Sequence, residues 1–215
     1  MFSKKSLIDE INKGCKLLFE SSFHLKLNQY NSFRISGNIT SKAINHYKNE
    51  KQEINVIKWF DVFWIYLEVK FADTFEPISR SDKRKVKKTN TFISLSVFQG
   101  DQSDDVKNQL FRAEWDDHNN EEEKHPQPHW HITSNQAIEK TFEEYTDTFE
   151  NVGFAELLKE EKTKILDVNR MHFAMNGNWI NDDNHIQSIN DIDKIVKWFQ
   201  GLFPHLREQL EYVNK

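Results

Sequence analysis

The chain has 215 residues, which suits a single domain with its own hydrophobic core. Its formal net charge of −5 excludes a basic field over the whole surface, so any contact with nucleic acid would depend on a local basic patch. Because Cys15 is the single cysteine and no apolar run resembles a signal peptide or a membrane span, we expect a cytoplasmic protein without disulfides or membrane contact.

The N-terminal part of the chain predicts one helix and two short strands. Apolar side chains follow helical spacing over residues 6–20, and Ser6 is placed to cap the helix N-terminus. These apolar residues are Leu7, Ile8, Ile11, Cys15, Leu18 and Phe19. Residues 32–39 and 42–47 have the composition of strands, and Gly37 predicts a turn or a bulge.

Four later segments alternate apolar and polar residues, which is the period of a half-buried strand. They are residues 61–71, 91–98, 110–116 and 129–132, and the first of them shows the clearest alternation. The side chains expected to be largely buried are Trp64, Ile65, Leu95, Phe111, Trp115, Trp130 and Ile132, although Trp64 falls at the parity of the polar positions.

The C-terminal third changes to a helical period. Residues 136–149, 154–166 and 191–199 each place apolar side chains on one helical face. Gly201 and Pro204 should interrupt the last of these helices before a final one begins.

Strands in one block followed by helices in another indicate an α+β fold. We expect one domain over residues 1–215, sheet-rich over 30–135 and helical over 136–215. The sheet should be antiparallel, with about five or six strands packed against N- and C-terminal helices.

The strands at 110–116 and 129–132 should pair in antiparallel fashion across the polar segment between them. Because alternation leaves one face for the core, their polar side chains must share the opposite face. These residues are Arg112, Glu114, Asp116, His129 and His131, and the same parity adds Ser94, Ser96, Glu68 and Lys70. We expect both histidines about 5 Å from the neighbouring strand's Arg112 and Glu114.

Three interpretations of this face stay open. In the first, a histidine transfers protons while an arginine or lysine stabilises a phosphate, as in RNA cleavage without a metal. In the second, His129 and His131 bind a divalent metal with Glu114 or Asp116, because residues two apart on a strand point the same way. In the third, the face is a solvated sheet surface without chemistry. We expect no tightly bound structural metal, because no set of four ligands has suitable spacing.

Residues 111–132, FRAEWDDHNNEEEKHPQPHWHI, resemble the pattern Arg-x-(Asp/Glu)-x-Asp followed by His-Pro-x-x-His-x-His of a group of uncharacterised bacterial proteins. They are also similar to the core motif of TumE-type toxins of toxin–antitoxin systems, with Glu114 in place of the commoner aspartate. The resemblance implies a bacterial effector that acts on RNA or arrests growth. The site positions that it implies are Arg112, Glu114, Asp116, His125, His129 and His131.

A basic stretch, RSDKRKVKK, lies between two predicted strands at residues 80–88. It is either a solvated hairpin tip or a phosphate-contacting loop. In the second case the residues that contact nucleic acid are Arg80, Lys83, Arg84, Lys87 and Lys88.

Two functions follow as expectations. The first is a toxin or antiphage-defence effector that acts as an endoribonuclease, a hydrolase, with no cofactor required and a divalent metal at His129 and His131 left open. The second is a non-catalytic binding or accessory subunit of a bacterial defence or toxin–antitoxin complex. Metal-dependent chemistry on a small molecule ranks below both. A protein partner could dock on the C-terminal helices through Trp198, Phe199 and Phe203, unless these side chains belong to the core.

Overall fold

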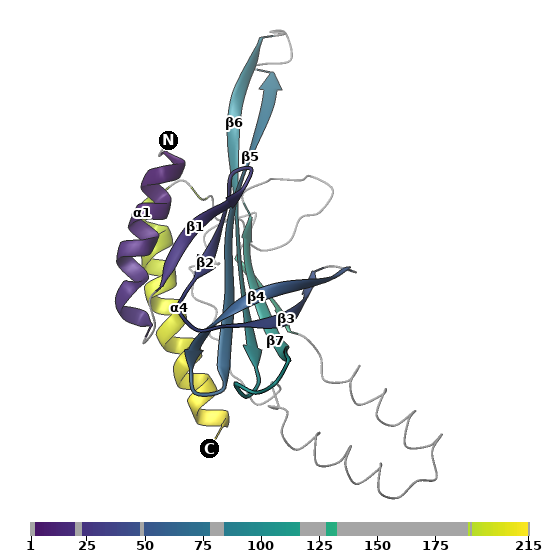
Figure 1. Ribbon diagram of the computed structural model, residues 1–215. Helices are drawn as coiled ribbons and strands as arrows, with labels where there is room; N and C mark the ends of the chain where they lie inside the picture. The colour runs from purple at the N-terminus through teal and green to yellow at the C-terminus, as the bar shows by residue number, and fades with distance from the viewer. Residues whose placement is uncertain are drawn as a thin grey trace, which may run out of the picture.

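Eight strands and two α-helices make up the part of the chain that the computed structural model describes, which is residues 3–19, 23–47, 50–77, 84–116, 128–132, 189 and 191–214 (Figure 1). The helices are α1 (Lys4–Cys15), followed by the 3-10 turn η1 (Lys16–Leu18), and α4 (Ile192–Val213). The strands are β1 (His24–Gln29), β2 (Ser32–Ser36), β3 (Thr40–Tyr47), β4 (Glu50–Phe60), β5 (Phe63–Pro77), β6 (Lys85–Gln99), β7 (Val106–Asp116) and β8 (His129–Ile132).

Strands β3 to β7 form a closed five-stranded barrel in chain order. Successive strands of such a meander run in opposite directions, so the first and the fifth must run the same way when the barrel closes. The structure has this parallel pair between β3 and β7, where Lys42 lies opposite Val106 and Ala43 opposite Lys107. The other strand pairs are antiparallel, including the β1–β2 hairpin that extends the sheet from β5 and the β8 strand that extends it from β7.

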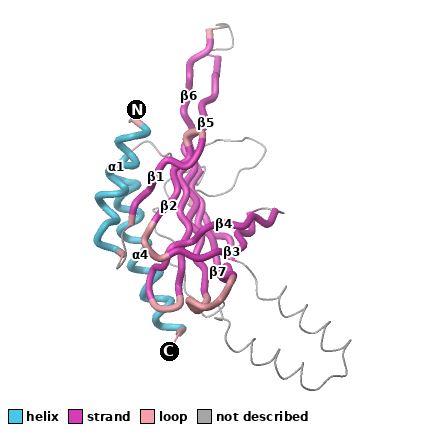
Figure 2. Tube along the Cα trace, in the orientation of Figure 1, coloured by secondary structure: helices cyan, strands magenta, loops and turns pink. Residues whose placement is uncertain are grey.

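Both helices cover the same side of this sheet, where α1 and α4 lie next to each other (Figures 1 and 2). Between helices and sheet lies the larger core, which includes Leu7, Ile11, Ile65, Leu95, Phe111, Trp115, Phe199 and Phe203. A second, smaller core fills the barrel and consists of Ala43, Ile54, Val56, Trp64, Tyr66 and Phe98. The strands that separate the two cores are therefore buried on both faces.

The α+β class and the packing against terminal helices are confirmed, whereas several details of the expectation are wrong. The sheet has eight described strands rather than five or six, it closes into a barrel, and one strand pair is parallel. Helix α1 takes its cap from Ser3, whose side chain accepts a hydrogen bond from the Ser6 backbone N–H. Helix α4 runs without a break through Gly201 and Pro204. The helices expected over 136–149 and 154–166 lie outside the described residues.

The burial expectations are confirmed for five of the seven apolar side chains, namely Trp64, Ile65, Leu95, Phe111 and Trp115. Trp130 is half-buried, and Ile132 is 50% exposed because β8 is short and lies at the edge of the sheet. On α4, Phe199 and Phe203 are buried and Trp198 packs against the core, so these three side chains contribute to the fold of the described chain. Neither described helix is long and apolar enough to cross a membrane.

Candidate functional site

The polar side chains of β5 to β8 stand in two rows that cross the strands. Hydrogen-bonded register places Glu68, Ser94, Glu114 and His129 in the first row. The second row contains Tyr66, Ser96, Arg112 and His131. The predicted antiparallel pairing of residues 110–116 with 129–132 and the predicted shared face are therefore confirmed.

This shared face is mostly buried, because the sheet curves so that the face lines the inside of the barrel and its rim. The polar residues of the two rows that are buried are Glu68, Ser94, Ser96, Arg112 and Glu114. A solvated sheet surface, which was the third interpretation of this face, is excluded for these positions. Buried polar groups are costly unless they are bonded to one another, so their arrangement has to be specific.

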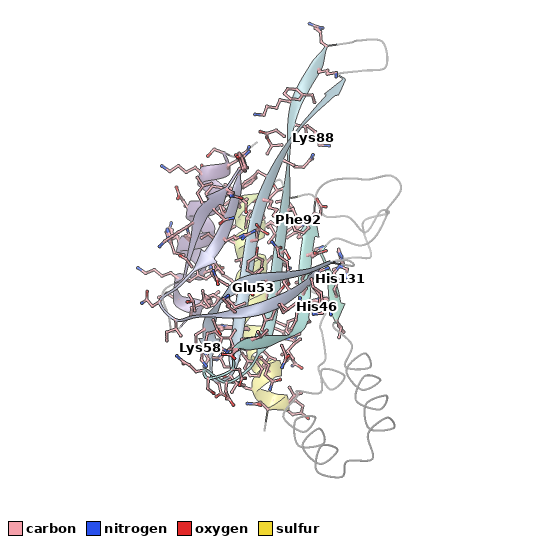
Figure 3. The ribbon with its side chains drawn as sticks, turned by 45° about the vertical axis from the view of Figure 1, so that its right-hand side comes forward. His46, Glu53, Lys58, Lys88, Phe92 and His131 are labelled. Atoms are coloured by element: carbon pink, nitrogen blue, oxygen red, sulfur yellow. The ribbon has the colours of Figure 1, made fainter. Side chains whose placement is uncertain are left out.

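Glu114, His129 and His131 form a compact group that we call the histidine cluster. The Nε2 atoms of the two histidines are 2.7 Å apart. Glu114 Oε2 lies 3.1 Å from His131 Nε2 and 3.6 Å from His129 Nε2. The Glu114 side chain is 8% exposed, that of His129 15% and that of His131 47%, so the cluster reaches from the barrel wall to solvent. Figure 3 shows His131 on the side of the sheet away from α1.

Arg112 holds the carboxylate of the cluster from the buried side. Its Nε atom is 2.8 Å from Glu114 Oε1, and its Nη1 atom donates a hydrogen bond to the backbone carbonyl of His46 on β3. The Arg112 side chain is 5% exposed. Arg112 therefore fixes the orientation of Glu114, and Oε2 of that carboxylate is the oxygen that faces the histidines.

The position of β8 follows from the divergence of β3 and β7. Strand β3 pairs with β7 near Val106 and Lys107, and β8 takes the same edge of β7 further along, from Phe111 to Glu114. The half-buried Trp130 packs edge-on against Phe111 with ring centroids 5.7 Å apart. Because Trp130 occupies the core side, the histidines on either side of it must project to the other face.

Of the six predicted cleavage-site residues, the structure brings four together: Arg112, Glu114, His129 and His131. Their charged and polar atoms lie 2.8 to 3.6 Å apart, which agrees with the expected spacing of about 5 Å between neighbouring strands, although their chemical roles stay predictions. Asp116 is half-buried on the same face, opposite Phe92, and lines a neighbouring cavity instead of joining the cluster. His125 lies outside the described residues.

A second polar group lies on this face, of which the sequence analysis predicted Glu68 and Lys70 but not Ser32, Arg34 or Tyr66. The buried carboxylate of Glu68 accepts hydrogen bonds from Ser32 Oγ at 2.6 Å, Arg34 Nε at 2.9 Å and Tyr66 Oη at 2.9 Å, and Lys70 Nζ lies 3.0 Å away. We call these five residues the Glu68 network. Burial by itself would raise the pKa of Glu68, but the hydrogen bonds from Ser32 and Arg34 and the Lys70 charge lower it below its ordinary value.

The Glu68 network borders a cavity of about 580 Å³. Arg34, Lys70, Thr91 and Asp116 contribute polar groups to its lining, and Phe92 contributes an aromatic ring. Glu68 and Glu114 share a cross-strand row with Ser94 between them, so the cavity and the histidine cluster open on the same face roughly 10 Å apart by strand spacing. A ligand of a few linked polar groups could contact both.

The basic stretch is partly a strand rather than a loop. Lys85 to Lys88 belong to β6 and pair with β5 from Thr74 to Pro77 in a two-stranded extension beyond the rest of the sheet, which we call the basic arm (Figure 1). Lys87 Nζ is 3.0 Å from Asp73, while Lys88 has the parity of the polar face and is half-buried. Arg84 is exposed at the start of the strand, whereas Arg80 and Lys83 lie outside the described residues.

Comparison of the chain with protein-family models, curated proteins and solved structures finds no match. Its function therefore has to be argued from the chemistry of the histidine cluster and its surroundings.

Proposed function

We propose that this chain is a nuclease that cleaves RNA at the histidine cluster. The observation that carries the proposal is the convergence of two imidazole nitrogens and one carboxylate oxygen, 2.7 to 3.6 Å apart, on the face that also holds a cavity lined by polar and apolar side chains. Imidazole and carboxylate groups in such proximity are the common components of proton-transfer and hydrolytic sites. The further proposal that the nuclease is a bacterial effector of the toxin or antiphage-defence type rests on the resemblance of residues 111–132.

In this proposal Arg112 is a positioning residue. Its side chain is buried, forms an ion pair with Glu114 and donates a hydrogen bond to the His46 carbonyl, so its contribution is to hold the carboxylate in place. Contacts to phosphate oxygens then come from the more exposed cations on the same face. Arg34 and Lys70 beside the cavity are 33% and 51% exposed, which leaves their charges accessible to a ligand.

The closeness of the two imidazoles constrains the mechanism. A metal-free cleavage needs a base at the 2′-hydroxyl and an acid at the leaving oxygen, on opposite sides of the phosphorus atom. Two Nε2 atoms 2.7 Å apart face one point rather than two. Either the exposed His131 ring turns away when RNA binds, or both rings act on one bound group.

The test is a comparison of wild type with the double variant His129→Ala/His131→Ala. Purified protein would be incubated with labelled single-stranded RNA, and expression cultures would be followed for growth and for integrity of cellular RNA. We expect the double variant to cleave at least about 100-fold more slowly, because both reactive groups are gone. His24→Ala removes an exposed histidine of β1 and serves as the matched control.

Equal cleavage by wild type and the double variant would contradict the proposal. Growth arrest by the wild type with intact RNA would favour the accessory-subunit function instead, with the cluster in a binding role.

The basic arm should hold the RNA strand without taking part in the chemistry. Lys88 is six residues from Ser94 along β6, and Ser94 lies in the same cross-strand row as Glu114. Lys88 is therefore about 20 Å from this row, a distance that an RNA strand of a few nucleotides can span. Neutralising Lys83, Arg84, Lys87 and Lys88 together should weaken RNA binding and reduce the slope of log affinity against log salt by up to about 3.

Fluorescence anisotropy at several salt concentrations measures both quantities. A control variant neutralises the same number of exposed lysines on the helical side, namely Lys5, Lys13, Lys16 and Lys197. An unchanged salt slope in the arm variant, or an equal change in the control, would show that the arm is a solvated hairpin.

A further inference from the structure

We propose that Glu114, His129 and His131 bind one divalent transition-metal ion through Glu114 Oε2 and the Nε2 atoms of both histidines. These three atoms all lie within 4.8 Å of one another. The inference concerns metal binding by the folded protein, so it can be tested separately from RNA cleavage. In the proposed reaction, such an ion would be the one bound group that both imidazole rings contact.

The spacing of the three atoms matches one face of a metal coordination sphere. With metal–ligand distances of about 2.1 Å, neighbouring ligand atoms lie about 3.0 Å apart in an octahedron and about 3.4 Å apart in a tetrahedron. The observed separations of 2.7, 3.1 and 3.6 Å bracket these values. A point about 2.1 Å from all three atoms exists roughly 1 Å outside their plane.

Hydrogen bonds within the cluster explain this arrangement less well. His131 Nε2 is close to both His129 Nε2 and Glu114 Oε2, yet a ring nitrogen carries either one proton or one lone pair. Protonation of both rings would place two positive charges 2.7 Å apart. A bound metal cation, in contrast, can accept a lone pair from Glu114 Oε2 and from the Nε2 atom of each histidine at the same time.

The surroundings pre-organise these atoms as a ligand set. Arg112 forms an ion pair with Glu114 Oε1, which leaves Oε2 facing the histidines, and neighbours of metal-binding carboxylates commonly orient them in this way. Trp130 anchors β8 against Phe111, and this contact fixes both histidines, two residues apart on one strand face. The three ligands therefore come from a buried strand and its anchored neighbour rather than from loops.

The donor atoms indicate which ions fit. Two imidazoles and one carboxylate suit first-row divalent ions such as Zn²⁺, Mn²⁺, Fe²⁺ or Co²⁺, whereas Ca²⁺ and Mg²⁺ prefer oxygen ligands alone. Three protein ligands leave coordination positions open, as in catalytic rather than structural sites. Because His131 is 47% exposed, those positions are accessible from solvent.

Isothermal titration calorimetry of the chelator-treated 215-residue chain with Zn²⁺ tests this proposal, and the visible absorption of added Co²⁺ gives a second, coordination-sensitive signal. We expect one ion per chain. His129→Ala, His131→Ala and Glu114→Gln should each weaken binding at least about 100-fold, which exceeds the effect of losing an outer-shell partner. His24→Ala should bind like wild type. Circular dichroism of each metal-free variant confirms that it is folded.

Wild type that binds neither ion would overturn the proposal, and so would folded variants whose affinity equals that of wild type. The two proposals fail in different ways. Stoichiometric binding at these residues without RNA cleavage would leave the metal site and remove the nuclease. Cleavage that persists in excess chelator, by a protein that binds no ion, would leave the nuclease and remove the metal site.

Discussion

Replacing Glu114 by alanine is expected to lower the free energy of unfolding by about 3–5 kcal/mol, because it leaves the Arg112 charge buried without its carboxylate partner. The Arg112 and Glu114 side chains are 5% and 8% exposed, and they are joined at 2.8 Å. Neither buried group is well hydrated, so removal of one partner leaves the other charge buried with neither water nor an ion pair to stabilise it. The loss should exceed that of any exposed ion pair in the described chain, such as Lys42–Glu53.

A double-mutant cycle separates the lost partner from the lost packing. Arg112→Met alone should also be destabilising, whereas Arg112→Met combined with Glu114→Leu should be less destabilising than the sum of the single changes. Urea denaturation in the presence of a chelator measures each free energy without a contribution from a bound ion. Additive effects, or a loss below about 1 kcal/mol for Glu114→Ala, would mean that the pair is effectively hydrated.

The histidine cluster could be predicted from the alternation of apolar and polar residues, because the burial of one side chain in a strand determines which face its neighbours occupy. Trp130 has an aromatic partner on the core side, and this assigns His129 and His131 to the other face whatever the rest of the fold does. The same argument placed Arg112 and Glu114, since Phe111 and Trp115 occupy the core side of β7. Ile132 broke the pattern because β8 ends there, beyond the reach of the core.

The closure of the barrel could not be predicted in this way, and β4 shows why. Ile54 and Val56 point into the barrel, whereas Ile57 and Trp59 belong to the core beneath the helices. The face of β4 that carries buried apolar side chains therefore changes along the strand, so the sequence of β4 shows no regular alternation of apolar and polar residues. Strand β1 has the opposite problem, because Leu25 is its one buried residue and leaves no periodic signal.

The Glu68 network could not be predicted either, because it depends on a strand pairing outside the barrel and on the curvature of the sheet. Arg34 reaches Glu68 because β2 pairs with β5, and this pairing has no local mark in the sequence. Alternation correctly put Glu68 and Lys70 on the polar face, but a flat sheet would have left that face in water. Curvature turns the same residues into buried groups that must satisfy one another.

Stability at acidic pH should depend strongly on Glu68. Its pKa is lowered in the folded protein, where burial opposes ionisation but hydrogen bonds from Ser32 and Arg34 and the charge of Lys70 outweigh it. The unfolded chain has the ordinary glutamate pKa of about 4.3. The carboxylate's contribution is therefore complete above about pH 4.3, and it is lost as the pH falls from there through the lower folded-state pKa.

Glu68→Gln should lower the free energy of unfolding by about 3 kcal/mol at pH 7. The charge-assisted hydrogen bonds to the buried carboxylate are replaced by weaker ones, and the NH₂ group of the new amide faces hydrogen-bond donors that it cannot accept from. At a pH below the folded-state pKa the wild-type carboxyl is neutral as well, so the difference between the two proteins should shrink towards zero. Chemical denaturation from pH 7 downwards measures this convergence.

The matched control is Glu53→Gln, which changes an exposed carboxylate that is paired with Lys42 on the same barrel. This substitution should change the free energy of unfolding by less than about 1 kcal/mol at every pH. A gap between wild type and Glu68→Gln that stays constant with pH would mean that the side chain's shape, and not its charge, stabilises the network.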